Sequence, residues 1–435
     1  MCDQLNASVL SCYGGPVPTP NIDRLARSGV KFTNATCTTP FCSPSRASIV
    51  TGLYPHKHGI VYNVNQLEHP SGCSPWTEQG LTVKDGTTER LLNDAGYATH
   101  HYGKWHLSEV SLPYYRDGYQ AHINYATEMV EKFWKVRLRD RKTWMDWYGW
   151  ALPMDISPVF KAAIKSVPAS WRRVRFATFI MRAGHLEFPV QETFDYRVAD
   201  HAIERIKSIG STPFMITCSM MDPHDPNAPP SPYYERFEPN SIKLPANLEY
   251  RAARFEDEWS RRIVDGVGVT GLRELLRIYY AATCMIDDQV GRVLKALDES
   301  GHSKDTIVVF CTDHGDMAGG HGMFWKSNSF FYEELVRVPF IISYPGRIKP
   351  QENSMECSLV DVMPTLLYLV GHPIPNYVQG RSLAAYLLGD KDPSTAPPFS
   401  FCERVQANRE HTRLVAPGTP SSFMVRGQGW KYIQY

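Results

Sequence analysis

Residues 306–316 have the sequence Thr306-Ile307-Val308-Val309-Phe310-Cys311-Thr312-Asp313-His314-Gly315-Asp316. The first six are β-branched or apolar, which is typical of a strand buried on both faces of a sheet. Two carboxylates and an imidazole follow directly. Open α/β sheets place ligands and reacting groups at the carboxyl ends of their strands. This run therefore predicts an α/β sheet with a functional site just beyond the strand.

Two other predicted strands are also followed by polar, chemically active residues. They are residues 97–102, before Lys104 and His106, and residues 214–219, before Asp222 and His224. Core packing alone does not require three polar clusters at equivalent strand ends. We therefore expect the three clusters to meet at one edge of the sheet.

Helix and strand patterns alternate along most of the chain. Apolar spacing predicts helices over 21–28, 195–209 and 272–297, and strands over 31–33 and 338–344. Such alternation is typical of a sheet covered by helices. The expected fold class is α/β, with a large mixed sheet flanked by helices on both faces.

Composition excludes some classes of protein. With 435 residues, of which 43% are hydrophobic, the chain can bury a large core, so it is not disordered or fibrous. Its net charge of +1 gives no reason to expect nucleic acid as a partner. Ten cysteines without a CxxC pair indicate buried thiols in a reducing compartment. No apolar run approaches the roughly 20 residues of a membrane span, so a cytoplasmic protein is expected.

The candidate nucleophile is Cys42, in the segment Pro40-Phe41-Cys42-Ser43-Pro44-Ser45-Arg46-Ala47-Ser48-Ile49-Val50-Thr51-Gly52. Pro44 suits the first turn of a helix, Ser43 its cap and Gly52 its end. Cys42 would then lie at a helix N-terminus, where backbone N–H groups favour an anion such as sulfate or phosphate. A soft thiolate is an unexpected partner for the hard oxygen ligands nearby. An ordinary loop cysteine is the alternative interpretation.

This segment resembles the signature of the type I, formylglycine-dependent sulfatase family of the alkaline phosphatase superfamily. There the cysteine is oxidised to formylglycine by a formylglycine-generating enzyme, and the resemblance implies the same conversion of Cys42. One hydroxyl of the hydrated aldehyde would attack sulfur, and the other would later lose its proton to expel sulfate. Phe41 departs from the family, which more often has a smaller residue there. The Cys-x-Pro-x-Arg core is intact.

The resemblance also implies one bound divalent metal ion. Residues 313–316 resemble one ligand segment of the family, and Met1-Cys2-Asp3-Gln4-Leu5-Asn6 resembles its opening segment. The implied ligands are Asp3, Gln4, Cys42, Asp313 and His314. Many sulfatases have two consecutive aspartates where this chain has Asp3-Gln4, so the site is less negative. Calcium is the first expectation, and manganese or magnesium are alternatives.

Two more segments resemble the family and imply catalytic roles. They are Tyr102-Gly103-Lys104-Trp105-His106-Leu107 and Met221-Asp222-Pro223-His224-Asp225-Pro226. By this resemblance, Lys104 holds the formylglycine hydrate or the sulfate, and His106 is the base that breaks down the intermediate. His224 binds sulfate or protonates the leaving oxygen. Lys326 contacts sulfate or the leaving group, and Arg46 orients the nucleophile.

Three features outside these motifs remain open to interpretation. His56 and His58 have the spacing of a zinc pair, but without a third nearby ligand a structural role is favoured. Asn63 is a candidate for the substrate pocket. Residues 131–183, within a variable insertion at 131–190, hold twelve Lys or Arg against four Asp or Glu. A helical insertion with solvated charges is favoured there, and a cationic lid or surface patch is the alternative.

The resemblance also predicts the organisation of the chain. It implies a catalytic domain at 1–385 and a partial C-terminal α+β subdomain at 386–435, with a hairpin at 422–435. Since only Met1 and Cys2 precede Asp3 in what should be a central strand, a fragment or misplaced start is expected.

The predicted function is hydrolysis of a small-molecule or saccharide sulfate monoester. A phosphonate or phosphate ester hydrolase of the same superfamily is the first alternative, because Asp3-Gln4 together with Asp313-His314 also resembles that branch. An inactive, binding-only homologue is the second alternative. Relative activity on sulfate and phosphonate esters separates the first two, and failure to bind metal or to convert Cys42 would support the third.

Overall fold

The computed structural model describes most of the chain, in nine ranges. These are residues 1–64, 80–81, 86–107, 154–160, 183–225, 228–252, 259–327, 330–405 and 421–435. Most of the basic segment at 131–183, and with it the choice between a packed insertion and a cationic lid, lies outside the described residues.

The central sheet is mixed. On one side, its strands run in the order β7 (Val308–Cys311), β8 (Phe340–Ser343), β1 (Val30–Phe32) and β9 (Gln351–Asn353). The strand β8 is antiparallel to both its neighbours, and β9 is parallel to β1. On the other side, β3 (Ala98–Gly103) and β6 (Phe214–Ser219) form a parallel pair.

The first residues of the chain connect these two groups of strands. The backbone N–H of Cys2 donates to the carbonyl of Cys311 at 3.0 Å, at the end of β7. On the other side, the Met1 ammonium donates to the carbonyl of Cys218 at 2.7 Å, and Met220 N–H donates to the Met1 carbonyl at 2.9 Å. Asp3 therefore follows a short extended segment between β6 and β7, as expected.

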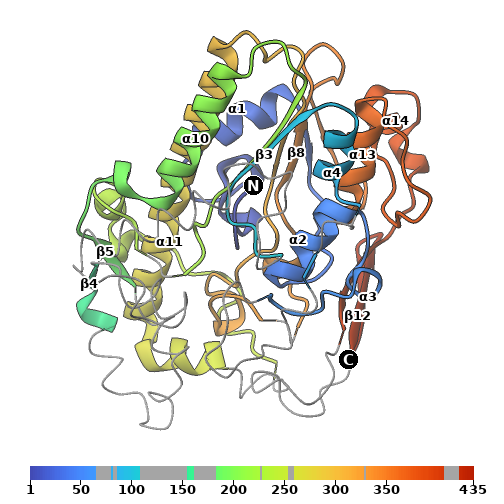
Figure 1. The fold of residues 1–435 in the computed structure, drawn as a ribbon. Helices are drawn as coiled ribbons and strands as arrows, with labels where there is room; N and C mark the ends of the chain where they lie inside the picture. The colour runs from blue at the N-terminus through green and yellow to red at the C-terminus, as the bar shows by residue number, and fades with distance from the viewer. Residues whose placement is uncertain are drawn as a thin grey trace, which may run out of the picture.

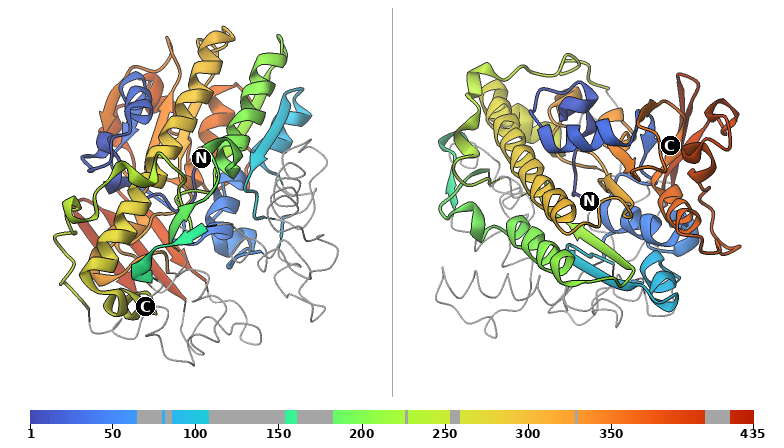
Figure 2. Two further views of the ribbon diagram at one scale, coloured as in Figure 1. Left: turned by 90° about the vertical axis from the view of Figure 1, so that its left-hand side faces the viewer. Right: turned by 90° about the horizontal axis from the view of Figure 1, so that it is seen from above.

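Helices cover both faces of this sheet (Figures 1 and 2). One face carries α1 (Pro20–Ser28), α10 (Phe194–Ser208) and α11 (Trp259–Glu299), and the other carries α2 (Cys42–Thr51), α4 (Thr88–Asp94) and α13 (Val362–Leu369). Phe310 belongs to the core on the α11 side, whereas the next residue, Cys311, belongs to the core on the α2 side. This alternation along β7 confirms the prediction of a strand buried on both faces.

The helix predicted over 272–297 is longer in the structure. It begins at Trp259, and the backbone of Gly268 leaves helical geometry, with φ 64° and ψ −170°. The prediction begins only at Leu272, because Gly266 and Gly268 are poor helix formers and weaken the helix signal of the preceding turns. The other predicted helices and strands agree with the structure to within two residues.

A small antiparallel sheet lies near the C-terminus. It consists of β11 (Ser400–Arg404), β12 (Ser422–Gly427) and β13 (Trp430–Gln434). The β12–β13 hairpin turns at Gln428 and Gly429, whose φ angles of 52° and 77° are typical of a two-residue hairpin turn. The predicted hairpin is confirmed. The domain boundary at 385 falls within α14 (Ala384–Leu388) and stays a prediction.

Two observations concern the cysteines and the helices. All nine cysteines in the described ranges are free thiols, and most are buried. Among the helices that the structure describes, none is long and apolar enough to cross a membrane.

His58 ends the short helix α3 (Pro55–His58) and has a structural role. Its Nδ1 accepts the Ile60 N–H at 3.1 Å, and its Nε2 lies 3.1 Å from the carbonyl of Pro44 in α2. These contacts suit a neutral imidazole with its proton on Nε2. Burial lowers the pKa of His58 to about 3.

We predict that His58 makes the protein less stable in acid. Its pKa is lower in the folded than in the unfolded chain, so its stabilisation is complete above about pH 6.5 and is lost as the pH falls toward 3. The slope is at most about 1.4 kcal/mol per pH unit for one group. Urea denaturation between pH 7 and 5 should show a shallower loss for His58→Gln than for wild type. His372→Gln, at a half-buried histidine, is the control, and an equal slope in all three proteins would contradict the assignment.

Candidate active site

The helix α2 begins at Cys42 itself. Phe41 occupies the cap position with an extended backbone, and Gly52 ends the helix in the left-handed conformation with φ 66°. The prediction that Ser43 caps the helix is wrong, because the helix starts two residues earlier than a Ser43 cap requires. The Ser43 hydroxyl instead donates to the carbonyl of His106 at 2.6 Å and accepts from Val64 N–H at 3.0 Å. Ser43 therefore ties the helix to two neighbouring segments.

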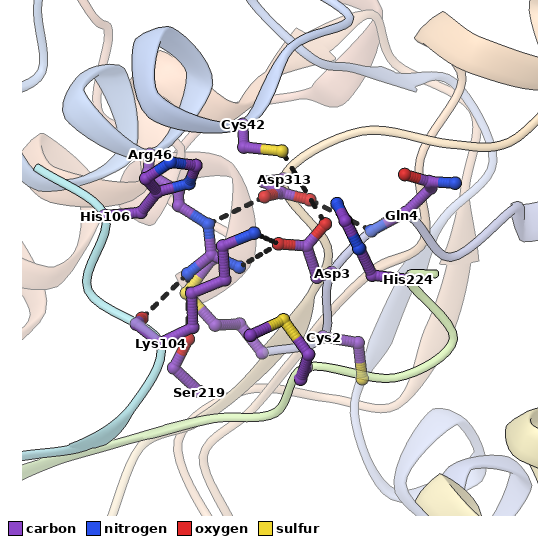
Figure 3. A network of polar contacts seen from close by, with 12 residues as sticks. Cys2, Asp3, Gln4, Cys42, Arg46, Lys104, His106, Ser219, His224 and Asp313 are labelled. Atoms are coloured by element: carbon purple, nitrogen blue, oxygen red, sulfur yellow. Dashed lines mark hydrogen bonds and ion pairs between the residues drawn. The ribbon is translucent and has the colours of Figure 1, made fainter. Parts of the chain in front are cut away.

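Four buried side chains converge at the start of α2, and Figure 3 shows three of them, Asp3, Cys42 and Asp313. Ligand atoms of Asp3, Cys42, Asp313 and His314 all lie within 4.8 Å of one another. The Cys42 Sγ is 3.2 Å from His314 Nε2 and 3.8 Å from Asp3 Oδ1. Two carboxylates and an imidazole that converge without exposure to solvent are a donor set that fits a divalent cation. In the part of the chain that the structure describes, this is the one cluster of its kind.

Gln4 lies next to this cluster, but its side-chain amide points away from it (Figure 3). Its Nε2 donates to Asp316 Oδ2 at 2.6 Å, and its Oε1 accepts from Lys326 Nζ at 2.7 Å. Only its backbone N–H faces the cluster, where it donates to Asp313 Oδ1 at 3.1 Å. The role of Gln4 as a metal ligand stays a prediction.

Arg46 is buried one turn along α2 and binds both carboxylates of the cluster. Its Nε donates to Asp313 Oδ2 at 2.7 Å, and its Nη2 donates to Asp3 Oδ2 at 3.0 Å. Its Nη1 donates to the Lys104 carbonyl and to Ser219 Oγ, each at 2.9 Å. Arg46 thus fixes the carboxylates that surround Cys42.

Positive charge strongly affects the Cys42 thiol. Burial raises its pKa, but Lys104, Lys326 and His314 lower it by more, so the pKa lies well below its usual value. Lys104 also forms an ion pair with Asp3. The site therefore favours negative charge at the position of Cys42, which formylglycine would occupy after conversion.

The two histidines nearest to Cys42 differ in their protonation. Burial, together with Lys104, lowers the pKa of His106 to about 4, so its imidazole is neutral near pH 7 and can accept a proton. Burial also opposes the charged form of His314, but Asp313 and Cys42 raise its pKa to about 9. The structure thus offers a base at His106 and a charged imidazole at His314 when no cation is bound.

The site has a buried floor and a half-buried rim. The floor comprises Asp3, Gln4, Cys42, Arg46, Lys104, Asp313 and His314. The rim comprises Phe41, Tyr62, His106, His224 and Lys326. On the rim, His224 Nδ1 is 2.6 Å from the Asp225 carbonyl, and its Nε2 is 2.5 Å from Lys326 Nζ. All predicted site residues are therefore brought together.

Asp195 supports the site, but the sequence does not predict this role. It lies in the first turn of α10 with 0% exposure, and its two oxygens accept the N–H groups of Met221 at 2.7 Å and Asp222 at 3.0 Å. These two residues begin the turn that carries His224. An acidic residue in a first helical turn is common, so the sequence holds no signal that links Asp195 to this turn.

Comparison with known proteins agrees with this architecture. The solved phosphonate monoester hydrolase SpPMH of Silicibacter pomeroyi has a TM-score of 0.76 at 21% identity, covering 100% of this chain and 86% of its own. The protein BT4656, solved with its substrate D-glucosamine-2-N,6-O-disulfate, has a TM-score of 0.69 at 21% identity, covering 100% and 87%. Together with the mixed sheet and its flanking helices, these neighbours define a fold of the alkaline phosphatase-like class, as predicted.

The chain belongs to the sulfatase family, whose model matches residues 1–372. The uncharacterised sulfatase YidJ of Escherichia coli is 28% identical, over 88% of this chain and 69% of its own length. The ulvan-active sulfatase of Formosa agariphila is 28% identical over 90% and 65%, and mouse steryl-sulfatase is 30% identical over 94% and 68%. The chain thus spans about two thirds of the length of these relatives. The predicted family and enzyme class are confirmed.

We predict that Asp195→Ala destabilises the fold. The substitution leaves two buried N–H groups without their acceptor, at a cost of about 2 kcal/mol or more in the free energy of unfolding. Asp195→Asn keeps one acceptor oxygen and should lose less. Urea denaturation provides the measurement. Asp298→Ala, which removes a half-exposed ion pair with Arg24, is the control and should lose less than about 1 kcal/mol. Equal losses at the two positions would refute the prediction.

Proposed function

We propose that this protein hydrolyses a sulfate monoester, with formylglycine derived from Cys42 as the nucleophile. The observation that carries this proposal is the convergence of Asp3, Asp313 and His314 on Cys42 at the N-terminus of α2. A helix N-terminus favours an anion, and the lysines around Cys42 favour negative charge at the same point. A nucleophile, an anion site and a candidate cation site therefore coincide.

Each residue around the nucleophile has a role in this proposal. Arg46 holds the two carboxylates, and Lys104 holds the hydrate or the sulfate. Lys326 and His224, on the rim, bind the sulfate and the leaving oxygen. After attack at sulfur releases the alcohol, neutral His106 takes the proton from the second hydroxyl, so that sulfate is expelled and the aldehyde is restored.

Asp3, Asp313, His314 and the converted Cys42 would hold one divalent cation, with Gln4 as a further ligand if its amide turns toward the cluster. The cation would supply positive charge that polarises the sulfate oxygens. Calcium is our first choice, because most of the donors are oxygen. The imidazole leaves manganese and magnesium as alternatives.

The proposed substrate is a small-molecule or saccharide sulfate, and the proposed partner is a formylglycine-generating enzyme. Several relatives bear the names of saccharide sulfatases, among them an N-acetylglucosamine-6-O-sulfatase of Bacteroides thetaiotaomicron that is 26% identical. Others are named arylsulfatase, steryl-sulfatase and choline-sulfatase.

A phosphonate or phosphate ester hydrolase is the second candidate function. The observation that favours it is the neutral amide of Gln4 in place of a second carboxylate, which leaves the site less negative. A phosphonate ester is also an anion, and the rim residues Lys326 and His224 could bind it equally well. Parallel rates on an aryl sulfate and an aryl phosphonate distinguish the two candidates.

We predict conversion of Cys42 when the protein is produced with a formylglycine-generating enzyme. The peptide that contains Cys42 should be about 18 Da lighter by mass spectrometry, because a thiol becomes an aldehyde. The converted protein should release sulfate from an aryl sulfate, whereas Cys42→Ala should lose at least about 10³-fold in rate. Cys12→Ala, at a half-buried thiol outside the site, should keep both properties. An unmodified Cys42 beside a competent modifying enzyme would overturn the proposal.

We predict that calcium stabilises the folded protein. A ligand that binds the folded state at 100 times its Kd adds about 2.7 kcal/mol to the free energy of unfolding. Differential scanning calorimetry after chelation should therefore show a higher Tm when calcium is restored. Asp313→Asn should weaken this shift, and Asp298→Asn, at a half-exposed pair, should not. A calcium-independent Tm for the wild-type protein would count against a calcium site, and manganese or magnesium would then be tested.

A further inference from the structure

Two aromatic side chains meet beside the nucleophile. The rings of Phe41 and Tyr62 lie with their centroids 4.8 Å apart and their planes tilted by 39°. Phe41 directly precedes Cys42 and has the extended backbone of a cap residue, with φ −149° and ψ 141°. The two residues are 21 positions apart in the sequence, so the fold, and not the local chain, brings their rings together.

Hydrogen bonds fix the segment that carries Tyr62 against the start of α2. The Asn63 Oδ1 accepts the N–H of Ser43 at 3.1 Å, and Val64 N–H donates to Ser43 Oγ at 3.0 Å. Ser43 in turn donates to the carbonyl of His106 at 2.6 Å. Tyr62 is therefore held at a defined place relative to Cys42. Asn63, a candidate pocket residue from the sequence, acts here as a support.

The position of the aromatic pair above the buried residues of the site suits contact with the leaving group of a bound ester. Both rings are half-buried, whereas Cys42 is fully buried, so the pair stands above the floor of the site. Phe41 adjoins Cys42 in the chain, and the Tyr62 ring packs on it, so the pair lies beside the nucleophile. Burial raises the pKa of Tyr62 to about 12. A neutral phenol at this point does not repel an anionic ester.

We propose that Phe41 and Tyr62 form one wall of the leaving-group site and select sulfate esters whose alcohol carries a ring, over esters of open-chain alcohols. The ring can be an aryl group or a pyranose, since both present a flat face to an aromatic side chain. This inference rests on the proposed sulfatase function and names the class of its substrate.

The test measures kcat/KM for three sulfate esters, per mole of formylglycine determined by mass spectrometry. The esters are 4-nitrophenyl sulfate, glucosamine 6-sulfate and hexyl sulfate. Tyr62→Leu should lower kcat/KM for at least one ring-bearing ester by about fivefold relative to hexyl sulfate, because the flat aromatic face is lost. Tyr62→Phe keeps the ring and should stay close to wild type. The separate loss for each ring-bearing ester tells whether the wall serves aryl or sugar groups.

Two further variants complete the design. Phe41→Leu removes the other ring and should give the same direction of change, and scaling to formylglycine corrects for any effect on the conversion of Cys42. Trp430→Leu, at a ring that is 82% exposed on the C-terminal sheet, is the matched control and should leave all three rates unchanged.

The outcomes separate this inference from the function on which it rests. An unchanged ratio of ring-bearing to open-chain rates in both leucine variants, with active wild-type protein, would overturn the inference and leave the sulfatase function standing. A converted wild-type protein that hydrolyses none of the three esters would overturn both.

Discussion

The interaction on which the site depends is the buried contact of Arg46 with Asp3 and Asp313. It joins three parts of the chain that are far apart in sequence: the N-terminal segment, helix α2 and the end of β7. Two carboxylates side by side without solvent repel each other, and each loses its hydration. The guanidinium offsets this penalty with planar, directed donors, which a lysine ammonium could not provide in the same geometry. Once Arg46 is in place, the N-terminus of α2 must lie over the carboxylates, and Cys42 with it.

The charged side chains of the floor and those of the rim differ in how their charges are balanced. On the floor, Arg46 and Lys104 balance Asp3 and Asp313, so these four groups have little net charge. On the rim, the described hydrogen-bond partners of Lys326 are Gln4 and His224. Among these described contacts, no carboxylate forms an ion pair with Lys326. An anionic ester that approaches therefore meets positive charge before it reaches the nucleophile. In the proposed function, the floor would order the reacting group and the rim would attract the substrate.

Sequence reasoning recovers the parts of this architecture that have a local signal. The strand β6 has a mostly apolar sequence, and its predicted bounds are those observed, although most of its residues are only half-buried. Cys42, His106 and Asp313 follow strands or open a helix, so their motifs place them at one edge of the sheet. The supports are different: Asp195 and Asp316 act through hydrogen bonds to distant segments, and neither spacing nor periodicity marks such contacts. The predicted cap of α2 is wrong for the same reason, since the Ser43 hydroxyl bonds to neighbouring segments rather than to its own helix.

The contacts of Gln4 give a physical reason for an amide at this position. Its Nε2 donates to the Asp316 carboxylate while its Oε1 accepts from Lys326. A carboxylate in the same place could accept from Lys326, but it would face Asp316 with no proton between them. Asp316 also accepts the N–H groups of Ala318 and Trp325, so it cannot turn away without leaving these buried donors unpaired. The amide thus connects the segment that carries Asp3 to the rim lysine, so one continuous set of hydrogen bonds holds both the candidate metal cluster and Lys326.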